Sequence, residues 1–230
     1  MKKKLNNITA LIPARKGSKG ILNKNLNNIH GEPLLAWTIK AALNSNYISK
    51  VIVSTDSKKI ADIAINYGAT VPALRPKKFA RDTSSTESVI KHYLENWSNE
   101  DETLVLLQPT SPIRIKETLD NAIEKFFKGK YDSFLSISRV KNHFLWKVKK
   151  NIALPQYNIN KRLRRQDMDD SNFMYFENGS IYIFCAKKFL EFENRLFGKI
   201  GYLILNKLES IDIDDEEDIV ITNALIKFIL

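Results

Sequence analysis

The feature that most constrains this chain is a regular alternation of strand and helix patterns through its first 138 residues. Short apolar runs bounded by turn residues predict strands that are buried on both faces, and apolar side chains at helical spacing separate them. The strands are expected at residues 9–13, 51–53, 69–74, 104–107 and 134–137, and the helices at 34–43, 60–67, 84–97 and 119–126. This order is typical of an α/β protein with an open, mostly parallel twisted sheet and helices on both faces, a Rossmann-like arrangement.

Polar stretches follow four of the expected strands, at residues 15–25, 54–56, 75–86 and 108–114. Ligands of open α/β sheets bind beyond the carboxyl ends of the strands. We therefore expect these four stretches to surround one binding site. Within the third stretch, Ser84 and Glu87 have the spacing of a capping box that opens the following helix.

The alternation stops at residue 139. Residues 139–178 carry several aromatic and basic side chains without a regular pattern, and we interpret them as an inserted arm that contacts a second copy of the chain. Strand patterns return at 180–184 and 202–205, and residues 211–214 lead into a last helix. We expect residues 1–230 to form a single domain, with 139–178 as the dimerisation arm.

The net charge of +10 has three possible explanations: nucleic-acid binding, anionic small molecules, or a Lys- and Asn-rich codon bias that leaves a solvated basic surface. The charge is spread along the chain, and no nucleic-acid-binding motif is found, which favours a compact phosphate site and no nucleic acid partner. Cys185 is the only cysteine, so a disulfide framework is excluded and a reducing, cytoplasmic setting is expected. The apolar run at 219–230 is too short to span a bilayer, so we expect no membrane partner.

The sharpest basic cluster is the loop after the first strand, residues 15–25. Gly17 and Gly20 would let the backbone come close to a ligand and present N–H groups. The cations around them are Arg15, Lys16, Lys19 and Lys24. The loop suits a polyphosphate, although it is neither a Walker A loop nor a Gly-x-Gly-x-x-Gly loop. The alternative, a solvated basic loop, stays open.

Two further stretches have candidate chemistry. Alternation along a strand would place Asp212 and Asp214 on one face, where a carboxylate pair can bind Mg²⁺ together with substrate phosphates. The alternative is that these acids only begin the last helix; we assign that role to residues 215–217 and the metal to the alternating pair. The turn at 108–114 contains two prolines that would hold polar side chains over the sheet edge, and an ordinary turn is equally compatible with it.

Taken together, these motifs resemble the CMP-sialic acid synthetases, the N-acylneuraminate cytidylyltransferases. The resemblance covers nearly the whole chain and is carried, in order, by residues 12–21 with Lys24 and Asn25, then 53–56, 75–76, 82–86, 107–112, 177–182 and 211–214. The opening motif is shared with related nonulosonate synthetases, so it indicates the class of enzyme better than the sugar. Residues 164–167, Arg-Arg-Gln-Asp, look like the sialic acid branch.

The resemblance implies a nucleotidyltransferase fold and a Mg²⁺-dependent reaction of CTP with N-acylneuraminate, a nine-carbon sugar acid, to give CMP-N-acylneuraminate and diphosphate. The C2 hydroxyl of the sugar would attack the α-phosphorus of CTP. By resemblance, the catalytic cations are Lys24, Arg15 and Lys19; the nucleotide contacts are Arg15, Ser18, Lys19, Lys24, Asn25, Arg75, Ser84 and Thr86; the sugar contacts are Gln108 and Arg165; and the metal ligands are Asp212 and Asp214. Arg165 would act in trans across a homodimer.

Two alternatives remain open at this stage. The same chemistry could act on legionaminate or another nonulosonate, which differ in substituents that the arm and pocket walls would read. A basic nucleic-acid-binding protein built on an α/β scaffold is the alternative from another class, and it would show binding that weakens steeply with salt.

Overall fold

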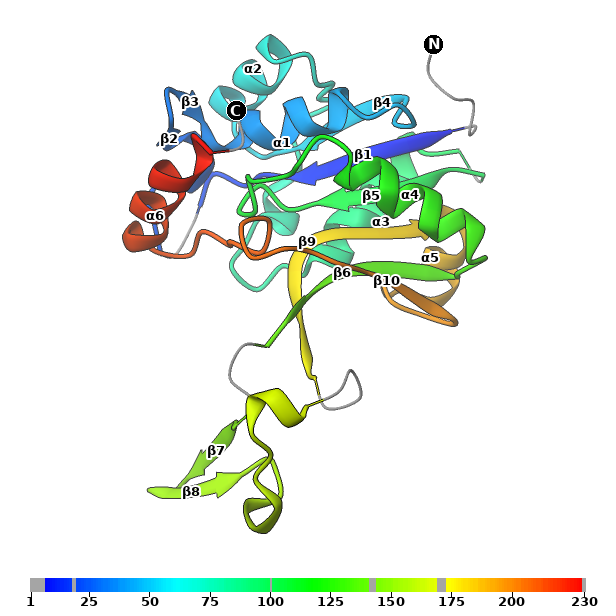
Figure 1. Cartoon of the computed structure of the whole chain (residues 1–230). Helices are drawn as coiled ribbons and strands as arrows, with labels where there is room; N and C mark the ends of the chain where they lie inside the picture. Colours follow the sequence, from blue (N-terminus) through cyan, green and yellow to red (C-terminus); the bar gives the residue numbers. More distant parts are fainter. Residues whose placement is uncertain (1–6, 18–19, 100, 141–143, 169–172, 229–230) are drawn as a thin grey trace.

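The computed structural model describes residues 7–17, 20–99, 101–140, 144–168 and 173–228. Within these residues, a six-stranded sheet has the strand order β10-β6-β9-β5-β1-β4 (Figure 1). Its strands are β1 (Ile8–Pro13), β4 (Lys50–Ser54), β5 (Thr103–Leu107), β6 (Ser133–Arg139), β9 (Tyr175–Cys185) and β10 (Ile200–Ile204). Parallel pairs join β4, β1 and β5, and β10 and β6, whereas β9 runs antiparallel to both of its neighbours. The expected mostly parallel sheet is confirmed.

Helices cover both faces of this sheet (Figure 1). They are α1 (Leu34–Leu43), α2 (Lys58–Asn66), α3 (Thr86–Trp97), α4 (Thr118–Lys128), α5 (Ala186–Phe192) and α6 (Glu216–Ile226). Alternation along β1 shows why both faces are apolar: Ala10 and Ile12 pack in the cluster with α1, α2 and α4, and Leu11 packs in the cluster with α3 and α5. A short hairpin of β2 (Asn28–Ile29) and β3 (Glu32–Pro33) precedes α1.

The strand expected at residues 69–74 is wrong. Only Thr70 pairs with the sheet, through a bridge to Ile52 in which the Thr70 N–H donates to Val51 O at 2.8 Å. Pro72 lacks an N–H, so a ladder cannot continue through it. The chain therefore leaves the sheet edge and runs on toward Arg75.

The capping box expected at Ser84 and Glu87 is also wrong. Ser85 is the N-cap of α3, and its side chain accepts a hydrogen bond from the Ser88 N–H. The Ser84 hydroxyl instead donates to Lys78 O at 3.0 Å and accepts from the Arg81 N–H at 3.1 Å, which closes the preceding loop. Glu87 forms an ion pair with Arg195.

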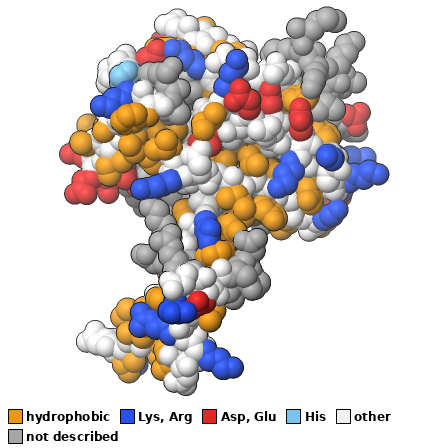
Figure 2. Space-filling view, in the orientation of Figure 1, with side chains coloured by type: hydrophobic (Ala, Val, Ile, Leu, Met, Phe, Trp, Pro, Cys, Tyr) orange, Lys and Arg blue, Asp and Glu red, His pale blue; other side chains and the backbone are white. Residues whose placement is uncertain are grey.

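The arm expected at 139–178 projects away from the sheet (Figure 1). The chain leaves β6 after Arg139, forms the hairpin of β7 (Trp146–Lys149) and β8 (Ile152–Pro155), and returns at the start of β9. The hairpin presents apolar side chains to solvent, with Val148 71% and Ile152 62% exposed. Figure 2 shows basic and apolar side chains gathered together on this projecting part.

A search of the described helices finds none with the length and apolar character needed to cross a membrane.

Candidate active site

A pocket of about 310 Å³ lies at the carboxyl ends of β1 and β5. The predicted site residues Arg15, Lys24, Asn25, Gln108 and Asp214 all line it, together with Pro13, Gly20, Pro109 and Thr110. The stretches after two strands of the sheet and the late acidic segment therefore meet in one place, as the sequence predicts. Neighbouring parallel strands end at the same edge, which is why residues far apart in the chain converge here.

Lys24 joins the basic loop to the acidic segment. It lies on a short 3-10 helix, Lys24–Leu26, and its side chain is largely buried. Its Nζ donates to Ile213 O at 2.6 Å and to Asp214 Oδ1 at 3.2 Å. The Asp214 carboxylate itself is exposed toward solvent, so one buried cation and one accessible anion face the same pocket.

Gly20 brings the two segments into direct backbone contact. A Cβ built at this position would lie well inside contact distance of the Asp214 carbonyl oxygen, which belongs to the backbone and has no side-chain freedom to move aside. Gly17, in the same loop, has open space around its Cα. The loop thus needs a glycine at 20 for close approach.

Gly20→Ala should therefore lower the free energy of unfolding by about 1–3 kcal/mol, because the added methyl group overpacks the contact with Asp214. Urea unfolding followed by circular dichroism measures this change. Gly17→Ala is the matched control and should alter stability by less than about 0.5 kcal/mol. Equal stability of the two variants would contradict the close approach at Gly20.

Arg15 connects the basic loop to the stretch that follows Thr70. Its Nη1 donates to Asp82 Oδ1 at 2.7 Å, and its backbone carbonyl accepts from Asn25 Nδ2 at 3.0 Å. The ion pair is half exposed, so solvent screens it and a phosphate could compete for the guanidinium. Asp82 was given no role from the sequence, although it lies in the polar stretch 75–86 and begins the motif 82–86.

Arg75 is a second cation near the same loop. The residue is 4% exposed, its N–H donates to Thr55 O at 2.7 Å, and its Nε has no hydrogen-bond partner within the described residues. Burial lowers the pKa of this guanidinium below its ordinary value, the charge of Arg15 lowers it further, and the charge of Asp56 opposes both. Asp56 also accepts from the Lys16 N–H at 2.8 Å, so it ties the basic loop to this region.

The strand expected at 211–214 is wrong, although the alternation that motivated it is present. Ile213 is buried while Asp212 and Asp214 are exposed, and the segment pairs with a loop through the Ile213 N–H and Thr110 O at 2.8 Å. No neighbouring strand is available to build a ladder there. Asp215 is the N-cap of α6 and forms a capping box with Asp218, as expected for the helix-start acids.

Asp212 and Asp214 lie close enough to affect each other's charge. Although Asp212 has exposed surface, neighbouring atoms crowd its carboxyl group, and this desolvation raises its pKa above the ordinary value. The charge of Asp214 raises that pKa further, while a hydrogen bond with Thr110 and the charge of Lys24 oppose the shift. Two carboxylates that repel each other are a site that a cation would stabilise.

The predicted residues Arg75, Ser84, Thr86 and Asp212 do not line this pocket. Ser84 is engaged in its own loop, and Thr86 is the first residue of α3. Arg165 begins a short 3-10 helix in the arm, Arg165–Asp167. Ser18 and Lys19 lie outside the described residues.

A mostly parallel α/β sheet with helices on both faces, whose first strand leads into a glycine-containing basic loop that contacts Asp214, has the arrangement of the α/β nucleotidyltransferase fold. Comparison with known proteins narrows this class. The family model described as cytidylyltransferase matches residues 9–219, and the chain belongs to that family.

Three relatives illustrate the family. The CMP-N,N'-diacetyllegionaminic acid synthase of Legionella pneumophila is 40% identical over 227 residues, which cover 96% of each chain. N-acylneuraminate cytidylyltransferases of Escherichia coli O18:K1:H7 and Danio rerio are each 36% identical and match 92% and 94% of this chain. This chain spans about half the length of those two proteins, 50% in each case.

Solved structures confirm the fold. A CMP:2-keto-3-deoxy-manno-octonic acid synthetase complexed with CTP superposes with a TM-score of 0.72 at 13% identity, covering 98% of this chain and 100% of that one. A 4-diphosphocytidyl-2C-methyl-D-erythritol synthase from Anaerococcus prevotii gives 0.67 at 15% identity, covering 96% and 98%. At these identities the likeness concerns the fold alone.

Proposed function

We propose that this protein activates a nonulosonic acid by transferring to it the cytidylyl group of CTP, with release of diphosphate. N-acylneuraminate is the leading candidate for this sugar acid. One observation carries the proposal: in a chain of the cytidylyltransferase family, Lys24 joins the basic loop to Asp214, the member of the acidic pair that lines the same pocket. A phosphate chain bound there would meet cations on one side and a metal-binding pair on the other.

In the proposed reaction the C2 hydroxyl oxygen of the sugar acid bonds to the α-phosphorus, and the bond between the α-phosphorus and the bridging oxygen breaks. The hydroxyl proton is released, and diphosphate leaves. Catalysis of such a step is mainly positioning and charge stabilisation. Lys24 would stabilise charge on the α-phosphate, and Arg15, Ser18 and Lys19 would hold the β- and γ-phosphates.

The rest of the nucleotide is assigned to the loops on the same side of the sheet. Asn25, Arg75, Ser84 and Thr86 are the proposed contacts. The assignment is best supported for Arg75, because the Nε donor of its buried guanidinium has no hydrogen-bond partner within the described residues. Gln108 lines the pocket beside Thr110 and is the proposed contact to the sugar acid.

The acidic pair fits Mg²⁺. Within the described residues, no group of three or more His, Cys, Asp or Glu side chains gathers around a metal position, and a Mg²⁺ ion bound with substrate phosphates needs only one or two protein carboxylates. Asp212 and Asp214 would supply these two carboxylates. Their negative charges repel each other, and a bound cation would relieve this repulsion. When bound, the ion would neutralise charge on the phosphate oxygens.

Legionaminate is a second candidate substrate, and a specific observation favours it. The Legionella pneumophila relative matches at 40% identity along 96% of both chains. The two sugar acids share the carboxylate and the C2 hydroxyl that the reaction uses, and they differ only in ring and side-chain substituents.

A kinetic panel should therefore show diphosphate release only when CTP, Mg²⁺ and a nonulosonic acid are all present. Coupled diphosphate assays with N-acylneuraminate and with legionaminate then rank the two substrates by kcat/KM. A higher kcat/KM for legionaminate would make legionaminate, rather than N-acylneuraminate, the preferred substrate. Absence of release with every sugar acid, together with salt-sensitive binding to DNA or RNA, would instead support the nucleic-acid-binding alternative.

We further propose a cytoplasmic homodimer in which the arm of one protomer completes the sugar site of its partner. The exposed apolar side chains of the β7–β8 hairpin support this, because a monomer gains nothing from presenting them to water. Arg165 would hold the sugar carboxylate across the interface by a charge-assisted hydrogen bond.

Arg165→Ala should accordingly raise the KM for the sugar acid by about 10- to 100-fold, or about 1.5–3 kcal/mol, with little change for CTP. Arg164→Ala is the control, since Arg164 is paired with Asp167 of its own chain at 2.6 Å. Mixing Arg165→Ala with Lys24→Met chains should restore activity at low sugar-acid concentration, because one site of each mixed dimer has both residues. A mixture no more active than its components would rule out action in trans.

A further inference from the structure

Arg114 connects three separate parts of the fold. Its Nη1 donates to the Thr38 hydroxyl of α1 at 2.9 Å. Its Nη2 donates to two backbone carbonyls at 3.0 Å, Gln108 O after β5 and Ser180 O on β9. The guanidinium is a planar fork with donors aimed in several directions, which a lysine ammonium on a flexible stem cannot reproduce.

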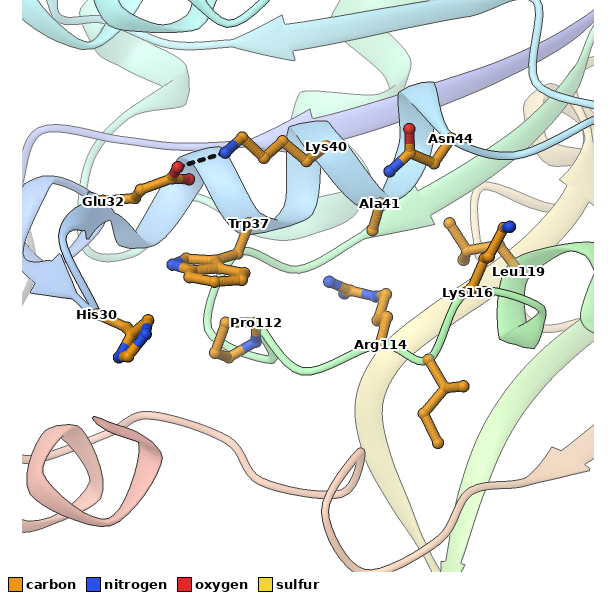
Figure 3. Close-up of a pocket in the computed structure, with 11 residues that line it drawn as sticks. His30, Glu32, Trp37, Lys40, Ala41, Asn44, Pro112, Arg114, Lys116 and Leu119 are labelled. Carbon is orange, nitrogen blue, oxygen red and sulfur yellow. Dashed lines mark hydrogen bonds and ion pairs between the residues drawn. The ribbon is translucent and has the colours of Figure 1, made fainter. Parts of the chain in front are cut away.

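The Arg114 side chain lies in a cavity other than the active-site pocket. In Figure 3, Arg114 extends from the segment after Pro112 toward α1, where it lines a separate cavity of about 400 Å³ together with Trp37 and Lys116. Arg114 is not part of the lining of the active-site pocket. It therefore acts on that pocket through the groups it holds.

The Arg114 guanidinium stays positively charged in this buried position. Burial lowers the pKa of Arg114 to about 10, while the negative charges of Glu209 and Asp212 act in the opposite direction. The group remains a cation at neutral pH, within electrostatic range of the acidic segment. Its Nε has no hydrogen-bond partner within the described residues, so the hydrogen bonds to Thr38, Gln108 and Ser180 come from the two terminal nitrogens.

The wall of the active-site pocket formed by Gln108, Pro109 and Thr110 is consequently fixed at two points. Arg114 donates a hydrogen bond to the Gln108 carbonyl. The Ile213 N–H of the acidic segment donates to the Thr110 carbonyl at 2.8 Å. Removing the first contact would leave the Gln108 carbonyl with the longer hydrogen bond from the Ser111 N–H at 3.4 Å, so the Gln108 end of this wall could shift, while Lys24 and the basic loop keep their own contacts.

We propose that Arg114 is a positioning residue that holds Gln108 and the adjoining wall for the sugar acid, and that it acts on this substrate more than on CTP. This inference rests on the proposed function, because it names the substrate that the wall receives.

The test compares Arg114→Met, Arg114→Lys and the control Lys116→Met, whose side chain is exposed on the same segment. Arg114→Met should raise the KM for the sugar acid about tenfold and leave the KM for CTP within about twofold. Arg114→Lys should recover part of that loss, and Lys116→Met should match the wild type. Equal changes in both KM values, or an unchanged KM for the sugar acid, would overturn the proposal.

Two further measurements keep the result interpretable. Thr38→Val is nearly isosteric at a fully buried position and removes only the Nη1 acceptor; it should raise the sugar-acid KM by about threefold, and no rise would count against Arg114 even if Arg114→Met failed to fold. Amide hydrogen exchange should be faster at residues 108–111 in Arg114→Met than in wild type. That readout needs no turnover: an inactive wild-type protein would refute the proposed function, whereas unchanged exchange would refute the role of Arg114.

Discussion

Replacing Lys24 by Met should lower kcat by about 100- to 1,000-fold while the protein stays folded. The expectation follows from the position of the ammonium group, which is largely buried and held by Ile213 O and Asp214 Oδ1 at the floor of the pocket. A preorganised charge in a site with little water acts more strongly on a developing negative charge than the same group in solvent. Single-turnover measurements with saturating CTP and sugar acid report this step directly.

The control for Lys24 lies in the same loop. Lys16 is exposed, and its hydrogen bond within the described residues comes from its backbone N–H, to Asp56 Oδ1 at 2.8 Å. Lys16→Met should change kcat by less than about threefold, as expected for a solvated charge. If Lys16→Met and Lys24→Met lost equal activity, or if Lys24→Met kept its kcat, the assignment of Lys24 to the reacting phosphate would be wrong.

Asp214→Asn should cost on the order of 100-fold in kcat and move the Mg²⁺ dependence to higher concentrations. Asparagine keeps the shape of the side chain and can still accept from Lys24, so the fold should survive. The change removes one negative charge from the pair that the proposed metal occupies. A titration of activity with MgCl₂, fitted for each variant, separates a weaker metal affinity from a lower maximal rate.

Asp215→Asn is the matched control for this substitution. Asp215 is the N-cap of α6, and asparagine serves that role about as well as aspartate. Activity and Mg²⁺ dependence should therefore stay close to wild type, although the same charge is lost one residue away. Near wild-type activity of Asp214→Asn at low Mg²⁺ would refute the metal assignment.

Local sequence patterns predicted the elements that an apolar run or helical spacing marks. Strand β1, helix α1 and the central strand β5 follow directly from apolar runs and helical spacing. The errors occur where one residue decides: Pro72 ends a strand pattern that otherwise continues, and Ser85 rather than its neighbour caps α3. The antiparallel direction of β9 is set by the inserted arm, which returns the chain to the sheet at the same end where β6 leaves it, with Tyr175 opposite Arg139.

The site was predictable to the extent that motifs carry it. The basic loop and the acidic pair were each visible in the sequence; the rule on strand ends predicts where the basic loop lies, and the family resemblance implies that the acidic pair acts on the same phosphates. The bonds that join them were not visible, because Lys24 and Ile213 are 189 positions apart. Arg114 was missed as an individual residue for the same reason: its partners Thr38, Gln108 and Ser180 come from three elements, and nothing local marks their proximity.

The contact between Lys24 and residues 213–214 also bears on synthesis. Ribosomes deliver the chain from its amino end, so the basic loop emerges roughly ten seconds or more before the acidic segment that closes against it, at ordinary translation speeds. During that interval the sheet can begin to assemble, but the pocket lacks the acidic segment that lines one side of it. A nascent chain of this protein would thus complete this pocket only after residues 213–214 have left the ribosome.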